Sequence, residues 1–598
     1  MQRQLLAAAA AALVLAAAPP PARAQLELKW ALEGYYRTRA TSLSNLAPEP
    51  RKTITNAVTG EPIVMPDIRS TSYLTQRLRV SPSLAYGNVA KLYLQVDALD
   101  DVLYGDNNSI SSAPLFAVNG SNENYMGGPP QDSIAMSRAW IEFAVPVGQL
   151  RVGRMPSHWG MGVLANGGGS FNVDPSAPPG KRRKNLDYFF DDDFGDNHFG
   201  STNDRILFAT RPLTVLRTIQ KKEDTRSNLL VAYAFDKLSE APFLPDADRR
   251  FRPFGQSGFI SRGANEDDAN EHVVVVLYSD PDWEQVAITD ELRVGTYWVF
   301  RTEKEGFTSP QMGPPYDSPA DCEDSGVDPD SDECVTSDRG SFVWVGDVWA
   351  RVRYGPFYGE TEVVHIGGDS TGGVPFPSAN HYKKANITSG VLRAGYLTEM
   401  LDGILEVGYD SGDERLADSE FKQRPIHPDY NVGLILYEEV LRERSARVFG
   451  PNFITAANPD GARGFFTNGG VLNSKYLQLK GRFRPDFEGV RLFNPEIVGA
   501  VLFAWLDQWS DSPNVFVCPN PTETPEDCST SKYLGTEFDL ALKSRFYNEH
   551  LDFSLETGYL LFGDALQTRS NPDSGGSYAN PGAPSGAFTL QARIAYVF

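Results

Sequence analysis

The last eleven residues, FTLQARIAYVF (residues 588–598), alternate between apolar and polar side chains. A period of two residues predicts a β-strand with two different faces. Six apolar side chains on one face suit a wall that has lipid on one side and water on the other. An edge strand of a soluble sandwich would not normally leave such a face uncovered. The apolar set is Phe588, Leu590, Ala592, Ile594, Tyr596 and Phe598.

The same alternation recurs along the chain, for example over residues 91–98, 477–484 and 537–543. About 18 such segments are present, which predicts an all-β, antiparallel transmembrane barrel of 16–20 strands. An even number returns both chain ends to the periplasm, as in bacterial single-chain barrels. The predicted strands cover residues 26–40, 70–85, 88–100, 134–145, 148–155, 203–211, 227–237, 272–280, 288–302, 341–354, 357–366, 386–398, 402–410, 474–485, 497–508, 532–546, 550–562 and 587–598.

Short and long connections alternate between these segments. Tight links at 86–88, 146–148 and 354–356 alternate with long polar stretches such as 411–471. Transmembrane barrels have short periplasmic turns and long outer loops, whereas so many long loops would be unusual in a soluble domain. The run VGLILYEEVLRER (432–444) has apolar residues at helical spacing. It is therefore expected to be a helix or an irregular segment within the long 411–471 connection.

The first residues have the features of a secretory signal peptide. An early arginine precedes the apolar run 5–18, and Ala22-Arg23-Ala24 precedes Gln25, which predicts cleavage near Ala24. Residues 25–598 would then form the barrel. The full chain has a formal charge of −22, and loss of two arginines makes it −24. This acidic balance argues against nucleic acid as a partner. The signal peptide together with the final strand predicts a location in the cell outer membrane.

Three stretches carry a resemblance to a known family. RVGRMPSHWGMGVLANGGG (151–169), DDDFGDNHFGSTNDRI (191–206) and HPDYNVGLILYEEVL (427–441) are similar to a largely uncharacterised family of porin-like bacterial outer-membrane proteins. The final strand resembles the signal strand of such barrels, with Tyr596 and Phe598 as the membrane-insertion signal. The resemblance implies outer-membrane lipid, lipopolysaccharide and the barrel-assembly machinery as partners. Similar porins are often homotrimers, although no interface is legible in this sequence.

The stretch 151–169 is rich in glycine but lacks the lysine of a phosphate-binding loop. Pro156 removes a ladder donor and should end the preceding strand. The connection near 156–203 is therefore expected to fold into the lumen and to line a constriction. Trp159 and Met161 would pack on the wall, and His158 or Asn166 would face water.

Charges of both signs are predicted on the lumenal face of the strands. The residues expected to line the pore are Arg77, Arg79, Arg293, Arg351, Arg482, Asp97 and Asp347. A surplus of arginine at the narrowest point would favour anions. The principal hypothesis is an outer-membrane channel for passive diffusion of small hydrophilic solutes, with anions among the candidates. The simpler interpretation is that these charges pair across strands and keep the interior wet.

Three other functions were weighed. A structural or adhesive barrel would act through its outer loops and have a plugged pore. A soluble carbohydrate-binding β protein is opposed by the final strand. A hydrolase could use Asp191, Asp192, Asp193, Asp196 and His198 to activate water, but such residues are common in acidic loops and GxSxG does not occur. We therefore expect no enzyme activity and no cofactor.

Four cysteines form two close pairs in predicted outer loops, Cys322 with Cys334 and Cys518 with Cys528. An exported chain favours disulfides, and two local bridges are the simplest of three connectivities. No histidine is near to complete a zinc site. The acidic run 321–333 could supply oxygen ligands for Ca²⁺, but its spacing matches no EF-hand. A solvated acidic rim, with no metal, is the preferred interpretation.

Overall fold

The computed structural model describes most of the strands and several loop segments. The described residues are 28–46, 53–55, 62–64, 70–103, 134–168, 194–222, 227–237, 270–280, 291–303, 319–326, 341–370, 383–445, 467–485, 495–510, 516–518, 523–547, 550–567 and 585–598, without residues 199, 399, 416, 417, 419, 443, 468 and 517.

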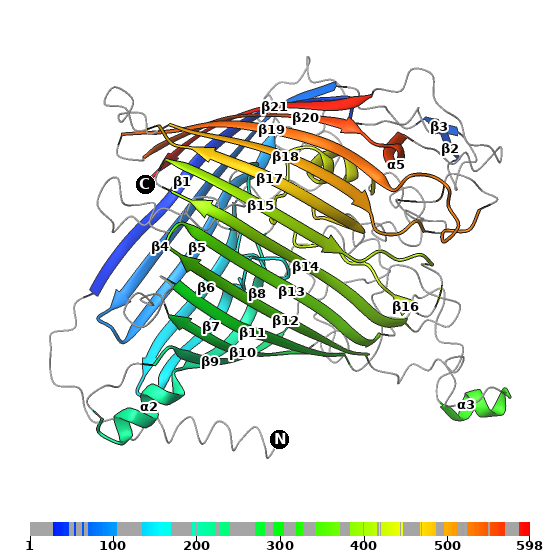
Figure 1. The fold of residues 1–598 in the computed structure, drawn as a ribbon. Coiled ribbons are helices and arrows are strands. Elements are labelled where there is room, and N and C mark those ends of the chain that lie inside the picture. The colour runs from blue at the N-terminus through cyan, green and yellow to red at the C-terminus, as the bar shows by residue number, and fades with distance from the viewer. Residues whose placement is uncertain are drawn as a thin grey trace, which may run out of the picture.

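Eighteen strands of this described part form one closed antiparallel ring (Figure 1). Each strand pairs with the next one in the ring, and β1 closes it by pairing with both β4 and β21. The strands are β1 (Leu28–Ser44), β4 (Ser70–Tyr86), β5 (Ala90–Leu103), β6 (Ile134–Val145), β7 (Gly148–Pro156), β8 (Thr202–Thr210), β9 (Leu229–Lys237), β10 (Asn270–Asp280), β11 (Glu291–Glu303), β12 (Ser341–Tyr354), β13 (Phe357–Ser370), β14 (Lys383–Leu397), β15 (Leu401–Asp410), β17 (Ser474–Phe483), β18 (Glu496–Leu506), β19 (Tyr533–Phe546), β20 (Leu551–Phe562) and β21 (Gly586–Val597).

Three shorter strands lie outside the ring. The two residues of β16 (Glu420–Phe421) pair in parallel with β14, while β2 (Thr53–Thr55) and β3 (Pro62–Val64) pair with each other. The helical elements are α2 (Pro212–Ile219), α3 (Pro319–Asp324), η8 (Leu436–Leu441) and α5 (Asp564–Gln567). None of the helices in the described ranges is long and apolar enough to cross a membrane.

The predicted antiparallel barrel of about 18 strands is confirmed, because every predicted segment corresponds to one strand of the ring. Tyr35 of β1 pairs with Val597 of β21, so β21 ends at the same rim at which β1 begins. The turns at that periplasmic rim are short between β4 and β5, β6 and β7, and β12 and β13. The link between β8 and β9 differs, because it contains helix α2, which was not predicted from the sequence.

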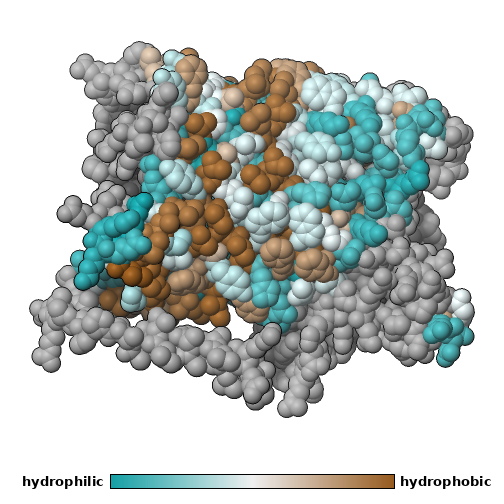
Figure 2. Space-filling model, turned by 60° about the horizontal axis from the view of Figure 1, so that its bottom comes forward, coloured by the Kyte–Doolittle hydropathy of each residue, from teal (hydrophilic) through white to brown (hydrophobic). Residues whose placement is uncertain are grey.

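The outer surface of the barrel is apolar. Large apolar side chains that point outward from the strands are exposed, such as Trp30, Leu392 and Ile594. Figure 2 shows apolar residues gathered in brown over the middle and left of one face, with hydrophilic residues toward the right. This arrangement is that of an outer-membrane barrel. Exposed aromatic side chains lie toward the periplasmic rim (Tyr86, Tyr354, Phe357, Tyr396, Tyr547 and Tyr596) and toward the outer rim (Trp298, Phe342, Trp505, Tyr559 and Phe588).

The buried core lies inside the barrel and consists of wall residues together with three loop segments. Met161, Phe194 and Leu436 belong to the same apolar cluster as wall residues such as Val345 and Val498. We call the loop segments the first (157–168), second (194–201) and third (422–442) inserted segments. They follow β7, precede β8 and follow β15, respectively. The run 432–444 thus contributes a one-turn helix, η8, to the core.

Candidate functional site

The first inserted segment begins where Pro156 ends β7 and is anchored to the wall by Trp159. The Trp159 ring stacks on Tyr297 of β11, with centroids 5.5 Å apart, and meets Trp349 of β12 edge-on at 5.9 Å. Its Nε1 donates a hydrogen bond to Asp347 Oδ1 at 3.1 Å. A buried indole needs such a partner, so Trp159 both packs and bonds on β11 and β12.

One wall carboxyl group holds the backbone of this segment. Glu362 of β13 accepts N–H groups from Met161, Val163 (3.2 Å) and Leu164 (3.4 Å). Gly160 has φ +56° and lies so close that a Cβ atom would collide with the Glu362 carboxyl group. Glycine is required here because other residues rarely adopt a positive φ and would displace the acceptor.

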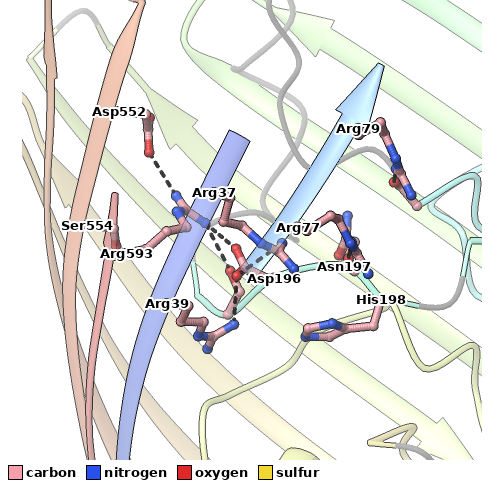
Figure 3. A network of polar contacts seen from close by, with 12 residues as sticks. Arg37, Arg39, Arg77, Arg79, Asp196, Asn197, His198, Asp552, Ser554 and Arg593 are labelled. Atoms are coloured by element: carbon pink, nitrogen blue, oxygen red, sulfur yellow. Dashed lines mark hydrogen bonds and ion pairs between the residues drawn. The ribbon is translucent and has the colours of Figure 1, made fainter. Parts of the chain in front are cut away.

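The second inserted segment places one carboxylate among three arginines of the wall (Figure 3). Asp196 Oδ2 lies 3.1 Å from Arg37 Nη1 and 3.0 Å from Arg39 Nη1, and Oδ1 contacts Arg593. The Asp196 side chain is 1% exposed. Burial raises the pKa of Asp196, but the guanidinium groups of Arg37, Arg39 and Arg593 outweigh it and hold this pKa well below the usual range.

These arginines belong to a row that crosses neighbouring strands. Arg37 of β1 lies directly opposite Arg77 of β4, and Arg39 of β1 lies directly opposite Arg593 of β21. Like charges directly opposite each other are destabilising. We call the row the arginine stripe, and it comprises Arg37, Arg39, Arg77, Arg79, Arg138 and Arg593 on β1, β4, β6 and β21.

The other arginines of the stripe include donors to the first and second inserted segments. Arg77 Nη1 donates to the Asn197 carbonyl at 2.9 Å. Arg138 Nη2 donates to the Gly167 carbonyl at 2.7 Å. Arg79 pairs with Asp97 of β5 at 2.5 Å and remains 16% exposed. Arg39 is 12% exposed, so parts of the stripe still reach water inside the barrel.

The third inserted segment is fixed by Glu537 of β19. This carboxyl group accepts the backbone N–H groups of Leu434, Ile435 and Leu436, each at 2.7 Å. These N–H groups precede and begin η8, where a helix leaves donors without intrahelical partners. Glu537 therefore caps η8 from the wall.

Asp429 joins the inserted segments to one another. Its Oδ1 accepts the N–H of His198 at 2.7 Å, and its Oδ2 accepts the N–H of Gly200 at 2.6 Å. The Asp429 carbonyl also accepts Asn166 Nδ2 at 3.2 Å. A single residue of the third segment thus bonds to the first and second segments.

His427 and Ser201 lie close enough to suggest a nucleophile and its base, because Nε2 is 2.9 Å from Oγ. However, His427 Nδ1 accepts the Asp429 N–H at 3.1 Å. Neutral imidazole carries its one proton on the other nitrogen, so Nε2 donates to Ser201 and has no lone pair to remove the hydroxyl proton. This geometry supports a structural contact between segments and gives no support to a catalytic one.

His427 predicts a pH dependence for the docking of the third segment. Burial, with a contribution from Arg424, lowers the pKa of His427 to about 4, against about 6.5 for an unperturbed histidine. Between these values the detached segment binds a proton that the docked segment does not. Protonation of His427 therefore destabilises the docked state as pH falls from 6.5 to 4, by about 3 kcal/mol in total. Burial raises the pKa of Glu438 and Glu439 in the same segment, and their protonation acts in the opposite direction. Hydrogen exchange of residues 427–441, corrected for intrinsic rates, should therefore accelerate over this range in the wild type relative to a variant without His427.

His427→Gln is the control for this prediction. Glutamine keeps a polar side chain but cannot titrate, so the pH profile of the variant should reflect only the other titrating groups of the segment. Equal pH profiles for the wild type and the variant would show that another group controls docking.

The predicted pore residues occupy two levels of the barrel. Arg77, Arg79, Asp97, Trp159 and Asp347 lie around the inserted segments. Arg293, Arg351 and Arg482 lie near the periplasmic ends of β11, β12 and β17 instead. They pair there with Glu291 at 2.7 Å, Glu360 at 2.6 Å and Asp402 at 3.5 Å, respectively.

The two residues expected to face water, His158 and Asn166, differ in their exposure to solvent. His158 is exposed, and its Nδ1 accepts the Gly167 N–H at 3.1 Å. Asn166 is 4% exposed, so of the two alternatives it is His158 that is exposed. Asn166 is buried because its amide donates to Asp429 and its Oδ1 accepts the Gly168 N–H at 2.9 Å.

Several residues that shape this site were not predicted from the sequence. Arg37 and Arg39 lie within a predicted strand, and extending the alternation through Tyr35, Arg37, Arg39 and Thr41 would have placed them in the lumen. The sequence contains no comparable signal for Glu362, because its role depends on a loop from a distant part of the chain. Of the four hydrolase aspartates weighed above, only Asp196 lies in the described residues, where it is an ion-pair partner.

Cys518 and Cys528 form the predicted disulfide, with Cα atoms 5.9 Å apart. Cys322 is also disulfide-bonded, and Cys334 lies outside the described residues, as does most of the acidic run 321–333.

Comparisons with known proteins give only distant likenesses. No protein-family model matches the chain, and no curated protein matches it. Among solved structures, the chain is similar to Pseudomonas aeruginosa OpdK with vanillate (8% identity, TM-score 0.40, 95% of this chain and 98% of that chain). It is also similar to P. aeruginosa OccK2 (OpdF) in complex with glucuronate (8%, 0.40, 95% and 98%) and to Acinetobacter baumannii OccAB1 (10%, 0.42, 95% and 97%). Likeness at this level does not indicate which solute the present chain handles.

Proposed function

We propose that this protein is an outer-membrane channel for passive diffusion of small hydrophilic solutes, with a preference for anions. A closed barrel of this strand number can leave an aqueous channel. Its interior is lined with charged side chains, and the arginine stripe gives one part of the wall a positive surplus, which favours anions.

The observation that carries this proposal is the direct opposition of Arg37 with Arg77 and of Arg39 with Arg593. Such pairs reduce stability, and a wall that served only to keep its interior wet would give each arginine its own carboxylate. At the periplasmic end, Arg293 and Arg351 are also directly opposite each other, but each has its own carboxylate partner, Glu291 and Glu360 respectively. The stripe differs because, among the described residues, its six arginines outnumber the carboxylates that pair with them, which include Asp97, Asp196 and Asp552.

Arg39→Gln tests the proposal. A unit charge about 4 Å from an ion changes the free energy of that ion by about 1 kcal/mol in a water-like medium. This corresponds to about a fivefold change in local ion concentration. The variant should therefore lower the anion-to-cation permeability ratio by up to about fivefold. The ratio is obtained from the reversal potential of the refolded protein in a planar bilayer under a salt gradient.

Arg154→Gln is the matched control. Arg154 pairs with Asp204 at 2.7 Å on the outward face of β7 and β8, and both are about half exposed. Its loss should leave the reversal potential unchanged. A cation-selective wild-type channel, or equal effects of the two variants, would contradict the role of the stripe.

A plugged structural or adhesive barrel is the second candidate, and the three inserted segments favour it. They are largely buried inside the barrel and bonded to the wall through Glu362, Asp196 and Glu537. A folded, heat-modifiable protein without conductance would support this candidate and exclude the diffusion channel.

Further properties of the protein are predicted from its sequence. The protein would act without enzymatic chemistry and without a cofactor, and the acidic outer loop would hold no dedicated Ca²⁺. Lipopolysaccharide, the barrel-assembly machinery and a second and third copy of the chain remain its predicted partners.

A further inference from the structure

Helix α2 lies in the connection from β8 to β9, at the rim of the barrel where the C-terminus lies (Figure 1). Pro212 begins the helix at a position where the missing N–H costs nothing. Lys221 ends it with φ +54°. Because strand parity places this rim in the periplasm, the helix is next to the periplasmic leaflet.

The helix has one apolar face, and within the described part of the chain most of this face is exposed. Leu213, Val215, Leu216 and Ile219 recur at helical spacing on one side. Leu213 is 41% exposed, Leu216 49% and Ile219 73%. None of the eight helical residues is buried. Exposed apolar faces of this kind mark an interaction surface.

The helix is continuous with the lipid-facing surface of the barrel. It follows Thr210 directly, and the outward-pointing Ile206 on the same strand is 52% exposed. Thr210 Oγ1 donates to the Val147 carbonyl in the turn between β6 and β7. Arg211, the N-cap residue, donates from Nη1 to the Ser227 carbonyl at 3.1 Å, just before β9. Both contacts hold the start of α2 at the edge of the apolar belt.

Basic residues accompany the apolar face. Arg217 lies in the last turn, and Lys221 and Lys222 follow it and are exposed. No acidic residue occurs between residues 211 and 222. A short helix with an apolar face and a cationic flank suits the plane of a membrane surface, and cations near such a surface attract anionic lipids.

We propose that α2 is an interfacial helix, which inserts Leu213, Leu216 and Ile219 into the periplasmic leaflet and contacts anionic phospholipid headgroups through Arg217, Lys221 and Lys222. This proposal rests on the membrane placement of the barrel in the proposed function but does not require channel activity.

Spin labels on the full-length protein test this proposal in vesicles of phosphatidylcholine with phosphatidylglycerol. Leu216→Cys and Ile219→Cys label the apolar face, and Thr218→Cys labels the opposite face. The ratio of oxygen to nickel-chelate accessibility should be several-fold higher at positions 216 and 219 than at position 218. Replacing Arg217, Lys221 and Lys222 with Gln should reduce the enrichment of phosphatidylglycerol over phosphatidylcholine at these labels, by about fivefold per cation.

A label at Leu405, which faces outward on β15 and is 40% exposed, separates the two ways in which the test can fail. Lipid exposure at position 405 with water exposure at 216 and 219 would overturn the interfacial helix and leave the membrane barrel intact. Water exposure at position 405 as well would overturn the membrane placement itself.

Discussion

Asp196→Asn is expected to raise single-channel conductance and to increase the preference for anions. The substitution keeps the size of the side chain but removes the negative charge shared by Arg37, Arg39 and Arg593. Removing one partner of a buried ion pair costs about 3–5 kcal/mol because the remaining charges are left uncompensated. The population of the state in which the second inserted segment is detached should then rise by roughly 100-fold or more.

Two consequences follow for permeation. Detachment of residues 194–198 widens the lumen, and the arginines that held Asp196 become available to passing anions. Planar-bilayer recordings should therefore show larger unitary currents, and the reversal potential should move toward that of the anion. Because the pKa of Asp196 is held well below its usual range, the wild-type contact should stay intact at mildly acidic pH.

Asp204→Asn is the matched control. Asp204 also pairs with an arginine, Arg154, but both side chains are about half exposed on the outer surface. Exposed pairs contribute at most about 1 kcal/mol, so conductance and selectivity should not change. Unaltered currents in Asp196→Asn would mean that the second segment does not obstruct the pore, and the role given to Asp196 would be wrong.

The wall of the barrel could be predicted from sequence because its signal is local. Every strand that separates lipid from the interior must alternate apolar and polar side chains, and this requirement is visible within eight to ten residues. Phe588 to Phe598 is the clearest case. The run 432–444, which contains η8, was expected to be a helix or an irregular segment for a similar reason, since Val432, Ile435, Leu436 and Val440 have helical spacing.

The contents of the barrel were harder to predict because they depend on distant contacts. Asn166 is polar and is followed by three glycines, which suggested water, yet it bonds to Asp429, 263 residues away. Glu362 and Glu537 resemble ordinary lumenal carboxylates in the sequence, and only the folded chain shows that they accept N–H groups from loops. Helix α2 was missed because eight residues give too few turns for a clear period.

Glu537→Ala is expected to release the third inserted segment from the wall. The carboxyl group accepts three backbone N–H groups at 2.7 Å. Each such bond contributes about 1 kcal/mol, and each buried donor left unsatisfied costs about 1–3 kcal/mol. The cost is reduced because Asp539, a second buried carboxyl group on the same face of β19, loses an acidic neighbour. The free energy that favours docking of the third inserted segment should therefore fall by about 3–6 kcal/mol.

The release should appear as protease cleavage within residues 422–442 of the folded barrel, which wild-type protein resists, and as larger or noisier currents. Glu537→Gln supplies the control, because its amide oxygen can still accept N–H groups and should retain most of the protection. Heat-modifiable mobility identifies barrels that remain closed, so loss of the barrel cannot be confused with loss of the segment. Continued protection in Glu537→Ala would show that η8 is held mainly by the apolar contacts of Leu436, Val440 and Leu441, which are all buried. The carboxyl group would then be a cap on a helix that packing alone keeps in place.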